Sequence, residues 1–358
     1  MFILKHILFL ILLFNPLNAQ IYDFSDFPNE DESFTIANFR IYIPEDIDTI
    51  RGIYAYMHGF GGDSRYIVQD SLMQELSKTV GFALLGLQLD NMYMDSGIGN
   101  SLIDAKANFA NQSNHSELIY SPVFFDGHSW GGQWSYHYTK WNPDDVIAFV
   151  TMKGGYHDTT YSESAINVPG YMFVGENDSN YRIKNLTDIF LKHRPSGALW
   201  ALAMESNAGH NRINDRNLLN SFLFDMINKR LPNSFNINEP VLLNQLIEND
   251  GFLGNRTTYE IFNHNCYGFD VDTLSWLSNL TNAENWQSFV SQNTSDSLVD
   301  FCFLGDLDYD EDLTILDVLL ILDIIINNSD YNTYADMNYN QSINIQDILI
   351  LIQQILNN

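Results

Sequence analysis

Short apolar segments rich in β-forming residues alternate with amphipathic segments over residues 34–232. Strands that alternate with helices are typical of a mainly parallel sheet covered by helices on both faces. The pattern therefore predicts an α/β domain whose last helix ends before Pro232. The strand-like segments are residues 34–43, 50–57, 82–89, 122–125, 146–152, 171–174 and 199–204, and helical spacing occurs at 67–79, 182–192 and 217–229.

Composition supports folded domains with a large core and excludes several partners. Of the 358 residues, 45% are hydrophobic and 17% are charged, which suits two or three domains and excludes wholesale disorder. Acidic residues outnumber basic ones by 45 to 17, which opposes binding to nucleic acid or to an anionic membrane surface and suits divalent cations. Only Cys266 and Cys302 are present, which excludes a disulfide scaffold and a four-cysteine zinc site, and their spacing leaves open whether they pair.

The first 19 residues have the pattern of a secretory signal peptide. Lys5 gives a basic start, residues 7–14 form an unbroken apolar run, and Ala19 is a small residue suited to cleavage before Gln20. The run is much shorter than the roughly 20 apolar residues of a membrane-spanning helix. We therefore expect export, with a mature chain that is secreted or attached to the cell surface and is not inserted in a membrane.

A G-x-S-x-G motif, residues 127–131, follows the strand-like segment 122–125 and opens a helical segment. In this pattern the glycines let the chain turn sharply from strand to helix, with the serine, here Ser129, exposed at the apex. The next backbone N–H, that of Trp130, can then stabilise a developing oxyanion. A glycine-rich turn after an earlier strand offers the Phe60 N–H as a second donor.

Two further residues complete the pattern of an acyl-transfer enzyme. Asp178 follows the segment 171–174 and His210 follows 199–204, so both are expected beside Ser129 at the carboxyl ends of parallel strands. Glu176 follows the same strand as Asp178 and remains an alternative partner for the histidine. The aromatic candidates for the wall of a substrate pocket, which favour an aromatic or alkyl group, are Phe60, Trp130 and Tyr156.

Four motifs carry a resemblance to a known family. They are His58-Gly59-Phe60-Gly61-Gly62, Gly127-His128-Ser129-Trp130-Gly131-Gly132, Gly175-Glu176-Asn177-Asp178 and Gly209-His210. Residues 34 to about 232 thereby resemble the α/β-hydrolase fold and, within it, the secreted esterases related to feruloyl esterases and polyester depolymerases. The resemblance implies that Ser129 is the nucleophile, His210 the base and Asp178 its partner. The sequence has no motif for catalytic zinc or for a nucleotide cofactor, so we expect no cofactor in catalysis.

The chain ends in an internal repeat, because residues 306–317 align with residues 336–347. Each copy is rich in carboxylate and amide side chains and runs into an apolar helical segment, 318–326 or 348–356. Oxygen ligands at positions 1, 3, 5, 7, 9 and 12 are typical of calcium loops. The candidate ligand positions are Asp306, Asp308, Asp310, Asp312, Thr314 and Asp317 in the first copy and Asp336, Asn338, Asn340, Ser342, Asn344 and Asp347 in the second.

Aspartate at position 12 and a short following helix make residues 304–358 similar to the type I dockerin module. The resemblance implies two Ca²⁺ sites and a cohesin-like protein partner, hence a role in assembly or surface attachment. Loop residues 10 and 11 would contact that partner: Ile315, Leu316, Ile345 and Gln346. Position 6, which is usually glycine, is Glu311 in the first loop and Gln341 in the second.

The sequence thus predicts four segments: a signal peptide at 1–19, an α/β-hydrolase domain at 20–232, an extension or connector at 233–303 and a dockerin-like module at 304–358. The expected function is that of an exported serine carboxylic-ester hydrolase acting on polymer-linked or aromatic esters. Two alternatives remain open, namely a serine peptidase on the same fold and a catalytically inactive binding protein displayed through the C-terminal module.

Overall fold

The computed structural model describes residues 20–45, 47–264, 271–292, 299–300, 304–308, 310, 312–329, 331–338 and 340–357. The predicted signal peptide lies outside these residues, as do Cys266 and Cys302. Export and pairing of the cysteines therefore stay predictions. Within the described residues, no helix is both long enough and apolar enough to cross a membrane.

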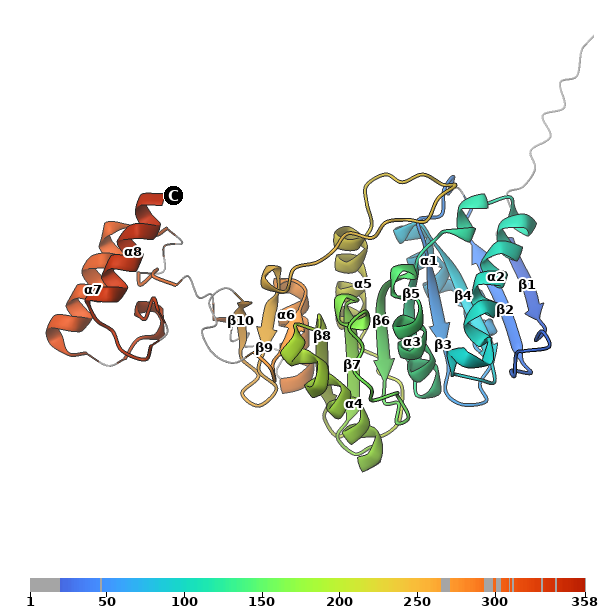
Figure 1. The fold of residues 1–358 in the computed structure, drawn as a ribbon, viewed down its shortest axis with the longest axis horizontal. Coiled ribbons are helices and arrows are strands. Elements are labelled where there is room, and N and C mark those ends of the chain that lie inside the picture. Colours follow the sequence, from blue (N-terminus) through green and yellow to red (C-terminus); the bar gives the residue numbers. More distant parts are fainter. Residues whose placement is uncertain are drawn as a thin grey trace, which may run out of the picture.

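A mainly parallel sheet organises the first part of the chain (Figure 1). Its described strands lie in the order β1-β2-β4-β3-β5-β6-β7-β8. Strand β2 is antiparallel to both of its neighbours, β1 and β4, and all the other neighbouring pairs are parallel. The strands are β1 (Gln20–Asp26), β2 (Ala37–Ile43), β3 (Gly52–Met57), β4 (Phe82–Leu89), β5 (Val123–His128), β6 (Val146–Met152), β7 (Gly170–Gly175) and β8 (Trp200–Glu205).

Helices cover both faces of this sheet, which confirms the predicted α/β architecture. One core cluster joins the sheet to α2 (Ile98–Ser113), α3 (Trp130–Trp141) and α4 (Asn180–His193), and the other joins it to α1 (Ser71–Val80) and α5 (Arg216–Arg230). Alternate residues of a strand enter opposite clusters, as the pleat requires. In β3, Ala55 faces the first cluster and Tyr54 faces the second.

Residues after α5 continue the same core and cover the edge strand β8. They form β9 (Phe252–Gly254), β10 (Ile261–Asn263), β11 (Ser275–Leu277), β12 (Val299–Asp300) and α6 (Leu280–Ser291). Ser275 Oγ donates to the Leu202 carbonyl and accepts from the Leu202 N–H, both at 3.0 Å, and Trp286 Nε1 donates to the same carbonyl at 3.2 Å. These contacts satisfy backbone groups that an edge strand otherwise leaves open to association.

Trp286→Ala should lower the free energy of unfolding by about 3–5 kcal/mol, because it leaves a cavity in the shared core and removes one of the two hydrogen bonds to the Leu202 carbonyl. Trp286 is fully buried, whereas Leu242 in the same part of the chain is 84% exposed. Urea denaturation followed by circular dichroism should therefore find Leu242→Ala close to wild type. Equal stabilities of the two variants would mean that this segment is only a connector.

The C-terminal repeat forms a small helical unit with a core of its own (Figure 1). Its helices are α7 (Ile315–Asn327) and α8 (Ile345–Asn357). They pack against each other through buried residues that include Ile321 and Leu351. The side chain of Thr314 caps α7 by accepting from the Leu316 N–H at 3.1 Å.

Candidate active site

The turn between β5 and α3 holds Ser129 in a strained conformation with φ 53° and ψ −118°. A non-glycine residue in this region is uncommon and requires support from its surroundings. The Ser129 N–H donates to the Met152 carbonyl at 2.6 Å. A Cβ on Gly127 would lie 2.5 Å from the Gly131 carbonyl oxygen, and one on Gly131 would lie 2.6 Å from that of His58, so this tight turn has room only for glycine at both positions.

Three side chains from the carboxyl ends of β5, β7 and β8 form one hydrogen-bonded chain. His210 Nε2 lies 2.9 Å from Ser129 Oγ, and His210 Nδ1 lies 2.8 Å from Asp178 Oδ2. An ionised carboxylate can only accept, so Nδ1 carries the proton. In a neutral imidazole, Nε2 is then the acceptor and faces the Ser129 hydroxyl.

Asp178 is held in its ionised form. Its side chain is only 2% exposed. Burial would raise the pKa of its carboxyl, but hydrogen bonds from His210, the Ser179 N–H and Arg182 outweigh burial and lower that pKa below its usual value. Arg182 Nη1 reaches Asp178 Oδ1 at 2.9 Å from one turn into α4. Sequence reasoning missed Arg182, and its spacing of four residues from Asp178 is the only signal that could have found it.

Glu176 lies away from the histidine. Its Oε2 accepts from the Asn207 N–H at 2.7 Å and from Ser206 Oγ at 2.9 Å. These two hydrogen bonds lower the pKa of the Glu176 carboxyl. Of the two acidic residues after β7, the structure therefore brings Asp178 to His210.

This arrangement predicts that Asp178→Asn and Glu176→Gln, which each remove one carboxylate, differ sharply in activity. Asp178→Asn should lower kcat by about 10⁴-fold, because the histidine loses the acceptor that fixes its tautomer. Glu176→Gln should stay near wild type, since it retains an amide oxygen for Asn207. Steady-state ester hydrolysis measures both variants, and the reverse ranking would assign the orienting role to Glu176.

The first turn of α3 and the turn at residues 58–62 both lie near Ser129. Trp130 is the first residue of α3, where N–H groups have no partner within the helix. The turn at residues 58–62 passes close by, since a Cβ on Gly59 would lie 3.8 Å from Ser129 Oγ. The Gly131 N–H donates to the His58 carbonyl at 3.0 Å and so ties this turn to α3. The Phe60 side chain is 83% exposed.

The structure also has an open cavity of about 660 Å³, and Ser129, Asp178 and His210 are not among its described lining residues. Of the three aromatic candidates for a pocket wall, Tyr156 lines the cavity, whereas Phe60 and Trp130 are not among its described lining residues. The N–H groups of Gly155 and Tyr156 donate to Gln133 Oε1 at 2.9 and 3.2 Å, and the Gln133 N–H donates to the Ser129 carbonyl at 3.1 Å. Gln133 therefore connects the cavity rim to the nucleophile turn. Further rings and polar groups of the wall come from Tyr93, His137, Lys140, Trp141, Asp158 and Asn185.

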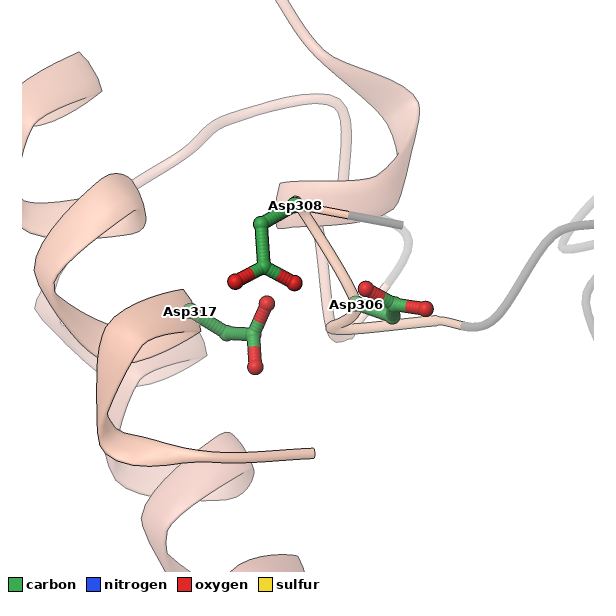
Figure 2. A group of neighbouring side chains, drawn as sticks. All are labelled: Asp306, Asp308 and Asp317. Carbon is green, nitrogen blue, oxygen red and sulfur yellow. The ribbon is translucent and has the colours of Figure 1, made fainter. Parts of the chain in front are cut away.

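Carboxylates of the first acidic loop converge in the C-terminal unit. One oxygen from each of Asp306, Asp308 and Asp317 lies within 4.8 Å of the others (Figure 2). Desolvation and the nearby carboxylates of Asp310 and Asp317 raise the pKa of Asp308. An all-oxygen set of this kind suits a hard divalent cation such as Ca²⁺. Asp310 Oδ1 accepts from the Asp312 N–H at 2.9 Å, which places both residues in the same turn.

The second loop repeats part of this arrangement. Asp336 and Asp347 are fully buried, and Asp347 Oδ1 has no hydrogen-bond partner among the described residues. Asp336 accepts from Tyr331 and from the N–H groups of Asn340 and Gln341. Two other candidate ligands, Asn338 and Ser342, lie in the same loop, where Asn338 Oδ1 accepts from the Asn340 N–H and the Ser342 N–H donates to Asn340 Oδ1. Asn344 Oδ1 accepts from the Gln346 N–H at 2.9 Å. Thr314 makes the equivalent contact at the start of α7, where it accepts from the Leu316 N–H.

No protein-family model matches the chain, and no curated protein matches it. Among solved structures, it is similar to an acetyl xylan esterase from Aspergillus awamori, with 13% identity and a TM-score of 0.44 over 58% of this chain and 99% of that one. It is also similar to FphF, a fluorophosphonate-binding serine hydrolase from Staphylococcus aureus, with 11% identity and a TM-score of 0.41 over 58% and 98%. A ferulic acid esterase matches with 9% identity and a TM-score of 0.39 over 55% and 92%. At these values the similarities carry no information on activity, which has to be argued from the residues of the site.

Proposed function

We propose that this chain is a serine carboxylic-ester hydrolase of the α/β-hydrolase fold. The observation that carries the proposal is the hydrogen-bonded chain from Asp178 through His210 to Ser129. A serine hydroxyl is a weak nucleophile unless a base takes its proton, and here the unprotonated Nε2 faces that hydroxyl. The strand order and the position of the three residues at the carboxyl ends of their strands support the same fold.

The reaction follows from these positions. Ser129 Oγ attacks the ester carbonyl while its proton passes to His210 Nε2, and Asp178 stabilises the imidazolium that forms. The N–H groups of Trp130 and Phe60 donate to the developing oxyanion. Collapse of the tetrahedral intermediate breaks the bond to the alkoxy group, which leaves as the alcohol with the proton from His210. Water, activated by His210 in turn, then hydrolyses the acyl-enzyme and restores Ser129.

The cavity whose rim Gln133 connects to the nucleophile turn supports a proposed substrate class. Tyr93, Trp141 and Tyr156 are each partly exposed around it, and its open shape leaves room for a group joined to a longer chain. Aromatic faces favour flat or apolar groups. We therefore propose aromatic or polymer-linked esters as substrates.

For the C-terminal unit we propose calcium binding and attachment to a cohesin-like partner. Asp306, Asp308 and Asp317 would hold the first ion, and Asp336 and Asp347 would belong to the second site. A bound ion would neutralise their mutual repulsion and order the loops. The helix starts support a docking role, because the apolar side chains there are more than half exposed: Ile315, Leu316, Leu319, Ile345 and Leu349. Export through residues 1–19 is part of the same proposal.

A panel of acetyl, feruloyl, aryl and polyester substrates, each paired with the corresponding amide where one exists, tests the proposed activity on the mature protein. We expect hydrolysis of esters and little of the amides. Comparable rates on amides would favour a serine peptidase. No hydrolysis of any ester, with retained binding to a cohesin-like module, would favour an inactive binding protein.

A further inference from the structure

Strand β5 contacts the segment of His210 through two side chains besides Ser129. Asp126 and His128 lie two residues apart on this strand, so they project from the same face of the sheet. Two residues after the histidine, Arg212 forms an ion pair with Asp126. His128 Nε2 lies 2.8 Å from the His210 carbonyl, which can only accept, so His128 donates. The strand that presents the nucleophile thus also holds the backbone of the base and the residue just beyond it.

The ion pair between Arg212 and Asp126 is largely buried. The Asp126 side chain is 1% exposed and accepts from the Tyr54 hydroxyl at 2.6 Å. The Arg212 guanidinium lies over the Tyr56 ring, 4.2 Å from its centroid. Burial would lower the pKa of Arg212, but Asp126 and the two tyrosines outweigh burial and raise that pKa, so the guanidinium is charged.

Stability alone is a poor reason for this pair. Replacing a buried ion pair by apolar residues of similar size is often neutral or stabilising. Here Asp126 Oδ1 and Arg212 Nη1 also find no hydrogen-bond partner among the described residues, so the pair is incompletely satisfied. The pair does, however, connect strand β5, which precedes Ser129, to the segment that carries His210.

The segment that carries His210 needs such links. Residues 206–215 lie between β8 and α5 and include no helix or strand. The imidazole itself is 34% exposed, so close packing does not fix it. A displacement of about 1 Å in a catalytic group can cost on the order of 10²-fold in rate. The hydrogen bond from His128 and the ion pair with Asp126 restrain this segment on either side of residue 211.

We propose that Asp126, Arg212 and His128 are positioning residues that hold His210 within hydrogen-bond distance of Ser129. The proposal rests on the serine esterase function proposed above. None of the three touches the reacting atoms, and their effect passes through the backbone of His210.

The test uses Arg212→Met and Asp126→Asn, with Lys106→Met as the matched control. Lys106 also forms a buried ion pair, with Asp145, and its side chain is 4% exposed. We expect Arg212→Met and Asp126→Asn to lower kcat by about 10²-fold with little change in KM, and Arg212→Lys to recover part of the loss. Lys106→Met should lose stability while keeping its kcat.

Variants of His128 provide a second test that removes no buried charge. This test remains informative if Arg212→Met does not fold. His128→Gln keeps an N–H donor for the His210 carbonyl and should retain more activity than His128→Leu. In the same variants, the rate of fluorophosphonate labelling at Ser129 should follow kcat. Folded Asp126→Asn and His128→Leu variants with wild-type kcat and labelling rate would overturn the positioning role while the esterase assignment stands. A wild-type protein that neither hydrolyses esters nor labels at Ser129 would overturn both.

Discussion

Ser129→Ala should abolish ester hydrolysis, with a fall in kcat of about 10⁶-fold, and His210→Ala should fall nearly as far. The two side chains act as a unit, because the hydroxyl is nucleophilic only while His210 Nε2 accepts its proton across 2.9 Å. Their losses should therefore not add in the double variant. Steady-state kinetics on one ester substrate measures kcat for the two single variants and the double variant.

Ser164→Ala is a suitable control for these variants, since Ser164 is exposed and lies outside the catalytic turn. It should keep the wild-type rate. Circular dichroism should find all the variants folded, because removing the Ser129 hydroxyl leaves the backbone contacts of the turn in place. Wild-type activity in Ser129→Ala would contradict the proposed mechanism.

Removal of calcium should unfold the C-terminal unit while leaving the catalytic rate unchanged. The carboxylates of Asp306, Asp308 and Asp317 repel one another without a cation, and the core beneath them is small. The proposed catalytic triad lies in the α/β domain, whose core is separate from that of the C-terminal unit, and the proposed mechanism needs no metal. Addition of a chelator to the mature protein should therefore increase hydrogen exchange in α7 and α8 and leave kcat as it was.

Calorimetric titration with calcium measures the two sites separately. At loop positions 1, 3, 5 and 12, where side chains supply the ligands, the first loop has four aspartates (Asp306, Asp308, Asp310 and Asp317) and the second has two (Asp336 and Asp347). The first loop should therefore bind calcium more tightly. Asp308→Asn should weaken the tighter site, whereas Asp323→Asn, the same change at an exposed position of α7, should not. Absence of calcium binding at millimolar concentrations would contradict the dockerin-like assignment.

Continuous apolar runs were the part of the fold that the sequence predicted well. Segments such as 82–89 and 146–152 are buried along almost their whole length, on both faces of the sheet. Strand β1 was missed because it lies at the sheet edge, where only part of each side chain is covered and polar residues interrupt the run. Its pairing with β2 depends on a neighbour in space more than on its own composition.

The residues of the site likewise fall into two groups, those that the sequence predicted and those that it missed. Ser129, Asp178 and His210 were identified because local motifs mark each of them, and the structure places them in one hydrogen-bonded chain. Arg212 and Asp126 have no motif, and they meet only because the segment after β8 folds back over β5. Contacts between distant segments of this kind require the topology to be known first.

The most direct test of the central claim is labelling of the mature protein with a fluorophosphonate, followed by mapping of the modified residue by mass spectrometry. The reagent reacts with a serine whose proton is taken by a neighbouring base, whatever the natural ester is. We expect one modified residue, Ser129, and loss of labelling in His210→Ala. Modification of a different serine, or labelling that persists in His210→Ala, would contradict the assignment of this catalytic centre.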